Sequence, residues 1–326
     1  MAERAKAPKI GVSPNAALGG HVDADLDTLA TALYVSIDDA LKTHPDLVRP
    51  RPKVGIEPRL SDAELCTLAV LQALLGFTSE ARWLRHAHAH LTHLFPYLPL
   101  QPGYNKRLRA AAGQLNALIR MLARDTSVFF DDTWVIDSTP VECGRSRPTA
   151  QRSDLAGHAG YGYCASHSRY FWGLRLHLVC TLAGLPVAFA LAHPKIDERE
   201  VARDLFEIDG GLLGSRPGQV ILADKGYASA EFESFLTERG ATLIRPARKG
   251  EKPRPGAQFL KPLRQLIESV NDTLKGQLDL ERHGGRTWGG VIARVLQRLL
   301  ALTAAIWHND RTGQPVLRSL IAYDHG

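Results

Sequence analysis

Cysteine is scarce in this chain, and so are long apolar runs. Only four cysteines occur in 326 residues, with no CxxC pair, so we expect a reducing compartment and no disulfide scaffold. The most apolar late stretch, residues 291–307, is interrupted by Arg294 and Arg298, whereas a membrane span needs about 20 apolar residues. The N-terminal residues carry charge but no apolar core typical of a signal peptide. We therefore expect a soluble, cytoplasmic protein without a membrane partner.

Several common catalytic signatures are also missing. The sequence contains no GxSxG, no P-loop, and no GxGxxG after a predicted strand. Their absence argues against acyl transfer, nucleoside triphosphate hydrolysis and dinucleotide binding. We expect no small-molecule substrate.

Charge is present but unevenly divided along the chain. The net charge is +6, yet residues 239–318 alone hold 15 basic and 6 acidic side chains, a net of +9. Residues 126–238 hold 10 basic and 15 acidic side chains. A basic flank beside an acidic middle suits an enzyme that holds phosphates with cations and metal ions with carboxylates. Scattered solvated charge explains the same numbers equally well.

The periodicity of apolar residues changes along the chain, which predicts an α+β fold. Residues 1–22 read as a flexible tail and residues 23–125 as helices, one of them opened by a capping box of Ser61 and Glu64. Short strands begin at Thr133, with two of them around the turn at Gly184. Helical spacing returns after residue 255. Strands followed by alternating helices and strands favour a mixed sheet flanked by helices.

Two aspartates follow apolar strands and are candidate catalytic residues. Asp137 closes WVIDST and Asp224 closes VILADKGY. A carboxylate at the end of a buried strand is costly unless it is paired, hydrogen-bonded or bound to metal. The two ends therefore suggest a shared site, although each aspartate taken alone is better explained by capping the loop that follows.

A third acid is expected from the helical stretch 263–278. Arg264, Glu268 and Lys275 lie at i, i+4 and i+11, on one predicted helix face. Asp272 falls on the same face, so spacing alone does not choose between Glu268 and Asp272. A solvated ladder of salt bridges is the other interpretation of this face.

These segments together resemble a known family. IDSTPVE, ADKGY and the string Arg264-xxx-Glu268-xxxxxx-Lys275 resemble the catalytic region of DDE-type insertion-sequence transposases. The helix is similar to the Tyr-Arg-Glu-Lys signature of that group, except that Lys261 stands in place of the signature tyrosine. KPLRQLIESVNDTLKGQLDLERHGG and LSDAELCTLAVLQALLGF most resemble the insertion-sequence family numbered nine-eight-two. The likeness extends over residues 23–323.

The resemblance implies a fold, a site and a reaction. It implies an RNase H-like domain over residues 130–280, with Asp137, Asp224 and Glu268 as catalytic triad and metal ligands. The preceding residues 23–125 would be a helical DNA-binding region, and residues 281–326 a helical extension. Three carboxylates suit two Mg²⁺ ions about 4 Å apart, with Mn²⁺ as substitute. The implied activity is cleavage of double-stranded transposon ends and transfer of the 3′-hydroxyl strands into target DNA, in the bacterial cytoplasm at the nucleoid.

Basic and aromatic residues near this region are candidate DNA contacts. Arg264 and Lys275 would reach phosphates that flank the scissile bond, as would Lys225 next to Asp224. The link RPARKGEKPRPG supplies further cations, and GHAGYGYCASHSRYFWG is expected to be a mobile loop whose aromatic side chains stack on unpaired bases. Trp172 in that segment is equally well explained as the start of a core strand. The remaining candidate DNA contacts are Arg245, Arg248, Lys249 and Trp172.

Three functional alternatives and one question of assembly stay open. The chain is interpreted as a transposase, as an RNase H-like nuclease without strand transfer, or as an inactive DNA-binding relic. Joining two ends to one target needs two active sites, so a homodimer on DNA is expected. The apolar stripe in residues 291–307 either forms the dimer face or packs on its own catalytic domain.

Overall fold

A computed structural model describes residues 26–48, 57–164, 168–208, 211–256, 260–316 and 320. For residues 208 and 261–264 it describes the backbone only. The expected tail, residues 1–22, lies outside the described residues, as does the side chain of Arg264.

Helices make up the first part of the chain, as the periodicity predicted. The predicted capping box opens α2: the Ser61 Oγ accepts the Glu64 backbone N–H at 3.0 Å, and the Glu64 carboxylate accepts the Ser61 N–H at 2.5 Å. Gly76, at φ +69°, ends the same segment in a conformation that favours glycine. The elements are α1 (Leu26–Thr43), η1 (Pro45–Leu47), α2 (Asp62–Leu74), α3 (Glu80–His90), α4 (Gln101–Ala110), α5 (Ala112–Arg124) and η2 (Ser127–Phe130).

A mixed sheet forms the second part. Its order is β2-β3-β1-β5-β6, with β4 also paired to β3. β1, β3 and β4 are antiparallel neighbours, whereas β5 and β6 run parallel to β1. This order confirms the mixed sheet that was predicted for an RNase H-like domain. The strands are β1 (Thr133–Gly144), β2 (Gly160–Cys164), β3 (Arg169–Thr181), β4 (Pro186–Ala192), β5 (Val220–Leu222) and β6 (Thr242–Ile244).

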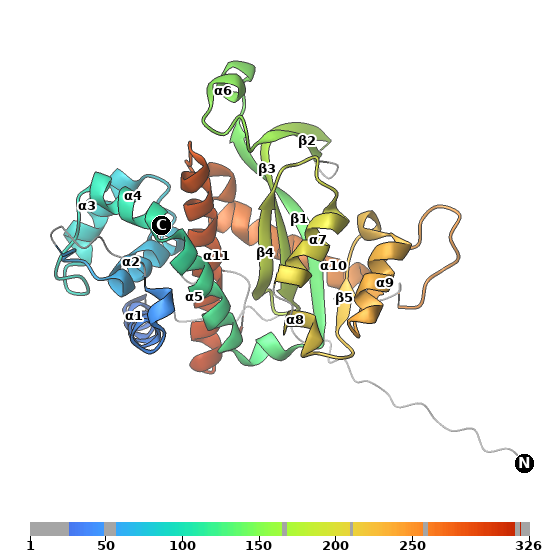
Figure 1. Cartoon of the computed structure of the whole chain (residues 1–326). Helices are drawn as coiled ribbons and strands as arrows, with labels where there is room; N and C mark the ends of the chain where they lie inside the picture. The colour runs from blue at the N-terminus through green and yellow to red at the C-terminus, as the bar shows by residue number, and fades with distance from the viewer. Residues whose placement is uncertain are drawn as a thin grey trace, which may run out of the picture.

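Helices cover both faces of this sheet (Figure 1), which confirms the predicted α+β architecture. α7 lies on one face and α10 on the other. α7 contacts Ser138 of β1 and α10 contacts Asp137, and these two adjacent strand residues point to opposite faces. The remaining elements are α6 (Arg147–Arg152), α7 (Glu198–Ile208), α8 (Gly211–Gly214), η4 (Lys225–Tyr227), α9 (Ala230–Glu238), α10 (Leu260–Asp272), η6 (Thr273–Gln277), η7 (Leu280–Arg282) and α11 (Trp288–Arg311).

The helix α11 runs between the N-terminal helices and the sheet (Figure 1). It is long and apolar enough to cross a membrane, but 83% of its apolar window is buried inside the protein. Its leucines at positions 296, 299, 300 and 302 are all less than 9% exposed. The apolar stripe therefore packs within its own chain, which corrects the alternative of a dimer face on this helix.

Two segments differ from the sequence prediction. Residues 160–164 form strand β2, where a mobile loop was expected; the pairing of β2 with β3 explains the difference. The helix expected through Leu278 changes at residue 273, because η6 is a π-helix with a wider turn. Side-chain directions predicted from a continuous α-helix therefore do not hold beyond Asp272.

Two buried histidines make stability depend on pH. His177 of β3 is 0% exposed and His283 is 3% exposed. Burial, the largest influence, lowers the pKa of each to about 4, whereas an unfolded chain has a histidine pKa of about 6.5. Between these values the unfolded chain binds more protons than the folded chain. These two histidines therefore cost no stability above about pH 6.5, and they lower the free energy of unfolding as the pH drops towards 4.

We expect this loss to reach up to about 3 kcal/mol per histidine. Urea unfolding measured from pH 4.5 to 7.5 tests it. His177→Gln should flatten the pH dependence by roughly one proton, whereas replacement of the exposed His88 by Gln should leave it as in the unmodified chain. Identical pH dependence in all three proteins would contradict the assignment.

Candidate functional site

Asp137 and Asp224 lie side by side at one edge of the parallel part of the sheet. The last pair between β1 and β5 joins Val135 to Leu222, and each aspartate comes two residues later. Alternate residues face the same side of a sheet, and neighbouring strands lie about 4.8 Å apart. Both carboxylates therefore project from one face. β1 itself continues to Gly144, so Asp137 marks the end of the pairing with β5 and not, as predicted, the end of its own strand.

The helix α10 brings Glu268 to the same place. Asn271, one turn after Glu268, donates from Nδ2 to the Asp137 Oδ2 at 3.1 Å and fixes α10 against β1. Asp137, Asp224 and Glu268 line one pocket, whereas Asp272 is absent from its lining. The other lining residues are Val135, Ile136, Leu222, Ala223, Leu260 and Ile267. The geometry thus distinguishes two acids that the spacing left equivalent.

The pocket is narrow and has oxygen donors on an apolar frame. Its volume is about 20 Å³, enough for one water molecule or ion. Carboxylate oxygens are the donors that Mg²⁺ and Mn²⁺ prefer, so the donor chemistry suits these ions. The three carboxylates share the pocket without converging on one point: among the described residues, no group of three His, Cys, Asp or Glu side chains is close enough to hold a metal ion.

A hydrogen-bonded network on the opposite face supports the two aspartates. Glu198, the first residue of α7, accepts from the Ser138 Oγ at 2.7 Å and from the Arg175 guanidinium. Arg175 also donates to the Ser138 Oγ at 2.8 Å. The other oxygen of Glu198 lies 3.1 Å from where a Cβ on Gly226 would stand. Glu198 therefore connects the strand of Asp137 to the turn that follows Asp224.

That turn is shaped by Asp224 itself. The Asp224 Oδ1 accepts the Gly226 N–H at 2.6 Å and caps η4. A Cβ on Gly226 would stand 2.8 Å from the same oxygen, so only glycine fits the turn without displacing the carboxylate. Tyr227 follows, fully buried, and burial together with the negative charges of Glu198, Asp137 and Asp224 raises the pKa of its hydroxyl well above the usual range.

Sequence analysis missed these supporting residues. Ser138 is adjacent to a predicted site residue, and Asn271 lies within the predicted helix, but neither was given a role, whereas Arg175 and Glu198 lie on separate elements. The ADKGY motif did contain a signal for Gly226 and Tyr227, because a glycine directly after a strand-end aspartate indicates a tight turn.

The predicted cations near the pocket have different environments. Lys225 is exposed next to Asp224, and Lys275 is half-buried on the π-helix η6. The predicted single face from Arg264 to Lys275 assumed one uninterrupted α-helix, and the change of helical repeat at Thr273 breaks it.

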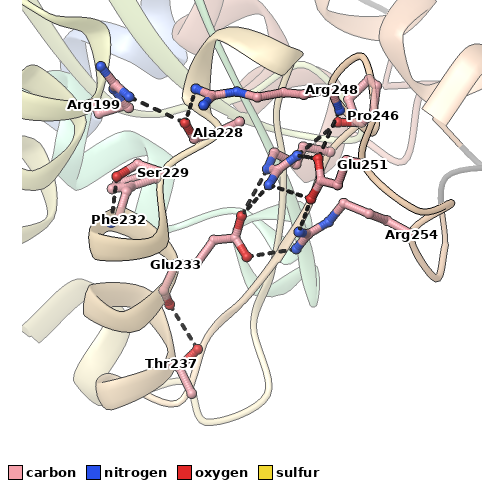
Figure 2. A network of polar contacts seen from close by, with 11 residues as sticks. Arg199, Ala228, Ser229, Phe232, Glu233, Thr237, Pro246, Arg248, Glu251 and Arg254 are labelled. Atoms are coloured by element: carbon pink, nitrogen blue, oxygen red, sulfur yellow. Dashed lines mark hydrogen bonds and ion pairs between the residues drawn. The ribbon is translucent and has the colours of Figure 1, made fainter.

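Arg245 corrects a second prediction. It is 5% exposed, and its guanidinium forms ion pairs with Glu233 and Glu251, both at 2.8 Å. Arg254 pairs with the same two glutamates, which closes a four-membered cluster between α9 and the loop after β6 (Figure 2). Because its charge is buried and neutralised, Arg245 does not present a cation to a phosphate. The cluster instead holds this loop on α9.

The neighbouring cations Arg248 and Lys249 are exposed. Arg248 donates to the Ala228 carbonyl, which also accepts from Arg199 at 3.3 Å (Figure 2). Ala228 directly follows Tyr227, so the loop is bound to the far end of the Asp224 turn. Arg248 is thereby held to the turn that follows Asp224, and Lys249 is the next residue of the same loop.

Trp172 corrects a third prediction. It is 6% exposed in β3, and its ring lies 3.1 Å from where a Cβ on Gly144 would stand. The interpretation of Trp172 as part of a core strand is confirmed. Other aromatic residues of the same segment are exposed: Tyr161, Tyr163 and Tyr170.

Fold and pocket define an α+β protein with an acidic pocket where the parallel strands β1 and β5 cease to pair. The family model described as the transposase DDE domain matches residues 129–304, more than half of the chain. The chain therefore belongs to the DDE transposases. The match runs through most of α11, beyond the end expected for the catalytic domain at residue 280.

The chain has little similarity to individual proteins. No curated protein matches the chain. Among solved structures, it is similar to the piggyBac transposase of a cryo-EM synaptic complex with hairpin DNA, at 11% identity and a TM-score of 0.38. That alignment covers 92% of this chain and 78% of the other. No residue role is transferred from it.

Proposed function

We propose that this chain cleaves the ends of a transposon and joins the freed 3′-hydroxyl strands to target DNA. One observation carries the proposal: Asp137, Asp224 and Glu268 line a single pocket in a chain of the DDE transposase family. Asp224 caps η4 and Asp137 accepts from Asn271, but neither contact requires a third carboxylate, that of Glu268, at the same pocket, where like charges oppose folding. A site that holds cations and transfers phosphoryl groups accounts for them.

The donor set suits Mg²⁺, with Mn²⁺ as substitute, and Asp137, Asp224 and Glu268 would hold it. Bound there, the metal would supply activation of the attacking oxygen and stabilisation of the leaving oxygen. The chain's own contribution is orientation. Asn271 fixes one oxygen of Asp137, and the backbone N–H of Gly226 fixes one oxygen of Asp224. Held in this way, the two carboxylates keep their spacing when DNA enters.

Cations around the pocket would hold the DNA backbone. Lys225 is exposed beside Asp224, and Arg248 and Lys249 lie on the loop bound to the same turn. Arg264 on α10 and Lys275 on η6 are proposed to contact phosphates on either side of the scissile bond. In the same proposal the chain is a member of the Tyr-Arg-Glu-Lys group, closest to the insertion-sequence family numbered nine-eight-two, and acts in the bacterial cytoplasm.

Assembly follows from the reaction. Two transposon ends joined to one target need two active sites at a fixed separation, and closed dimers are the commonest symmetric solution. We therefore propose a homodimer on double-stranded DNA. Light scattering of the protein with paired ends measures this, and a joining-competent complex that contains a single protein would contradict it.

A strand-transfer assay tests the proposed function. The purified chain is incubated with Mg²⁺, a supercoiled plasmid and short duplexes that carry the element's ends, either intact or already cut to expose the 3′-hydroxyl. Joined products from the pre-cut ends are the expected result. Cleavage of intact ends without any joining would favour the nuclease alternative, and binding without either reaction would favour an inactive relic.

A further inference from the structure

Exposed tyrosines gather on the β2–β3 hairpin. Tyr161 is 49% exposed, Tyr163 47% and Tyr170 78%. Among the described residues only eight large hydrophobic side chains are exposed, and three of them lie on this one hairpin. Such a concentration marks a surface that contacts something else, whereas single exposed apolar residues need no explanation.

The strand pairing puts these tyrosines on one face. Tyr163 lies opposite Tyr170, with ring centroids 5.1 Å apart, and Tyr161 lies opposite Trp172. The glycines between the tyrosines face the other way and pack closely: a Cβ on Gly162 would stand 2.6 Å from Phe171. The alternation Gly-Tyr-Gly-Tyr therefore packs β2 against its neighbours and directs both tyrosines outward.

Arginines surround the tyrosine face. A groove of about 320 Å³ runs beside it, lined by Tyr161, Tyr170 and Trp172 and by the arginines Arg145 and Arg169. Within residues 142–172 there are four arginines and two acids. Arg169 and Arg145 both pair with Glu142, at 2.5 and 3.8 Å, and the Arg145 side chain remains 84% exposed. The other two arginines of this segment, Arg147 and Arg152, are exposed on α6, at the same end of the sheet (Figure 1).

The tyrosine face lies on the same side of the sheet as the acidic pocket. Asp137 pairs with Leu178 of β3, so the two side chains share a face of the sheet. Tyr170 lies eight positions before Leu178 on the same strand, and because alternate residues face the same side, Tyr170 also projects from that face. A single guanidinium also joins the two regions. Arg175 donates to the Tyr163 carbonyl at 2.8 Å and to the Ser138 hydroxyl at 2.8 Å, directly after Asp137.

We propose that Tyr161, Tyr163 and Tyr170 bind unpaired nucleobases of the DNA strand that leads to the scissile phosphate. Aromatic faces stack on any base, and flanking arginines neutralise the backbone, which is the combination that binds single strands. In duplex DNA the base faces are covered by their neighbours, so the surface selects DNA that is opened or single-stranded at this point. The inference rests on the proposed function for the identity of the polymer and adds a distinct substrate feature.

Binding measurements with matched variants test the proposal. The probe is a fluorescent oligodeoxynucleotide, offered single-stranded and as its duplex. Tyr161→Ala/Tyr170→Ala should weaken single-strand binding by about tenfold or more, and should change duplex binding by less than threefold. Tyr161→Phe/Tyr170→Phe keeps both rings and should bind like the unmodified chain, as should Tyr34→Ala, which removes an exposed tyrosine from α1. A single Tyr170→Ala, at the most exposed position, serves if the double variant does not fold.

Each outcome decides the proposal. Unchanged single-strand affinity in the alanine variants, or an equal loss for both DNA forms, would overturn it. So would a change in oligomeric state with unchanged DNA affinity, which would make the tyrosine face a contact between protein chains. Failure of the proposed function is distinguishable, because a chain that neither cuts nor joins DNA can still lose single-strand affinity selectively when the tyrosines are removed.

Discussion

Replacing Asp137, Asp224 or Glu268 with its amide should abolish both cleavage and joining, while DNA affinity stays within threefold of the unmodified chain. Asn and Gln keep the shape of the side chain but remove the negative charge that binds divalent cations. We expect rates at least about 1,000-fold lower, because the loss of one carboxylate removes charge stabilisation of the transition state worth several kcal/mol. Affinity is preserved because phosphates are bound by cations elsewhere on the surface.

Asp272→Asn is the matched control, since Asp272 lies one turn further on α10 and does not line the pocket. Cleavage of end-labelled DNA on a denaturing gel and binding by fluorescence anisotropy give the two measurements. An active Glu268→Gln variant together with an inactive Asp272→Asn variant would show that the third acid is Asp272. Equal loss of binding and of cleavage in all three variants would instead indicate damage to the fold.

Local signals predicted much of the fold. The Ser61 and Glu64 capping box and the stop at Gly76 are encoded within a few residues, and both are confirmed. β2 was missed because Gly160–Cys164 is rich in glycine, and its strand conformation depends on pairing with β3. The π-helix η6 has no comparable local signature in the sequence. For β2, the tertiary contact outweighs the local preference.

Some residues of the candidate site also had local signals in the sequence, and others did not. Apolar strands ending in acids pointed to Asp137 and Asp224, because a carboxylate in that position needs a reason. The choice of Glu268 over Asp272 came from the family resemblance and agrees with the lining of the pocket. Glu198 and Arg175 could not be found, since they meet Ser138 only across three elements. Arg245 was misassigned because its sequence neighbours are basic, whereas its partner Glu233 lies on α9.

The contact between α3 and α11 gives the largest expected effect on stability. Glu80, 7% exposed at the start of α3, forms an ion pair with Arg294 in the second turn of α11. Gln101 and Asn105 also donate to the Glu80 carboxylate, at 2.9 and 2.7 Å. Burial lowers the pKa of Arg294 to about 10, so the guanidinium remains charged at neutral pH. This pair connects the N-terminal helices to the buried helix α11.

Glu80→Ala should lower the free energy of unfolding by about 3 kcal/mol, because it leaves the Arg294 charge buried without its carboxylate. This value is the lower end of the range that is usual for breaking a buried ion pair, because a cleft of about 590 Å³ beside the pair admits water to the vacated position. Glu80→Leu/Arg294→Met removes both charges and should recover much of the loss. Asp38→Ala breaks the exposed pair with Lys42 on α1 and should change stability by less than about 1 kcal/mol. Urea unfolding at pH 7 compares all four chains, and a Glu80→Ala midpoint equal to that of Asp38→Ala would mean that the buried pair contributes no more than a surface one.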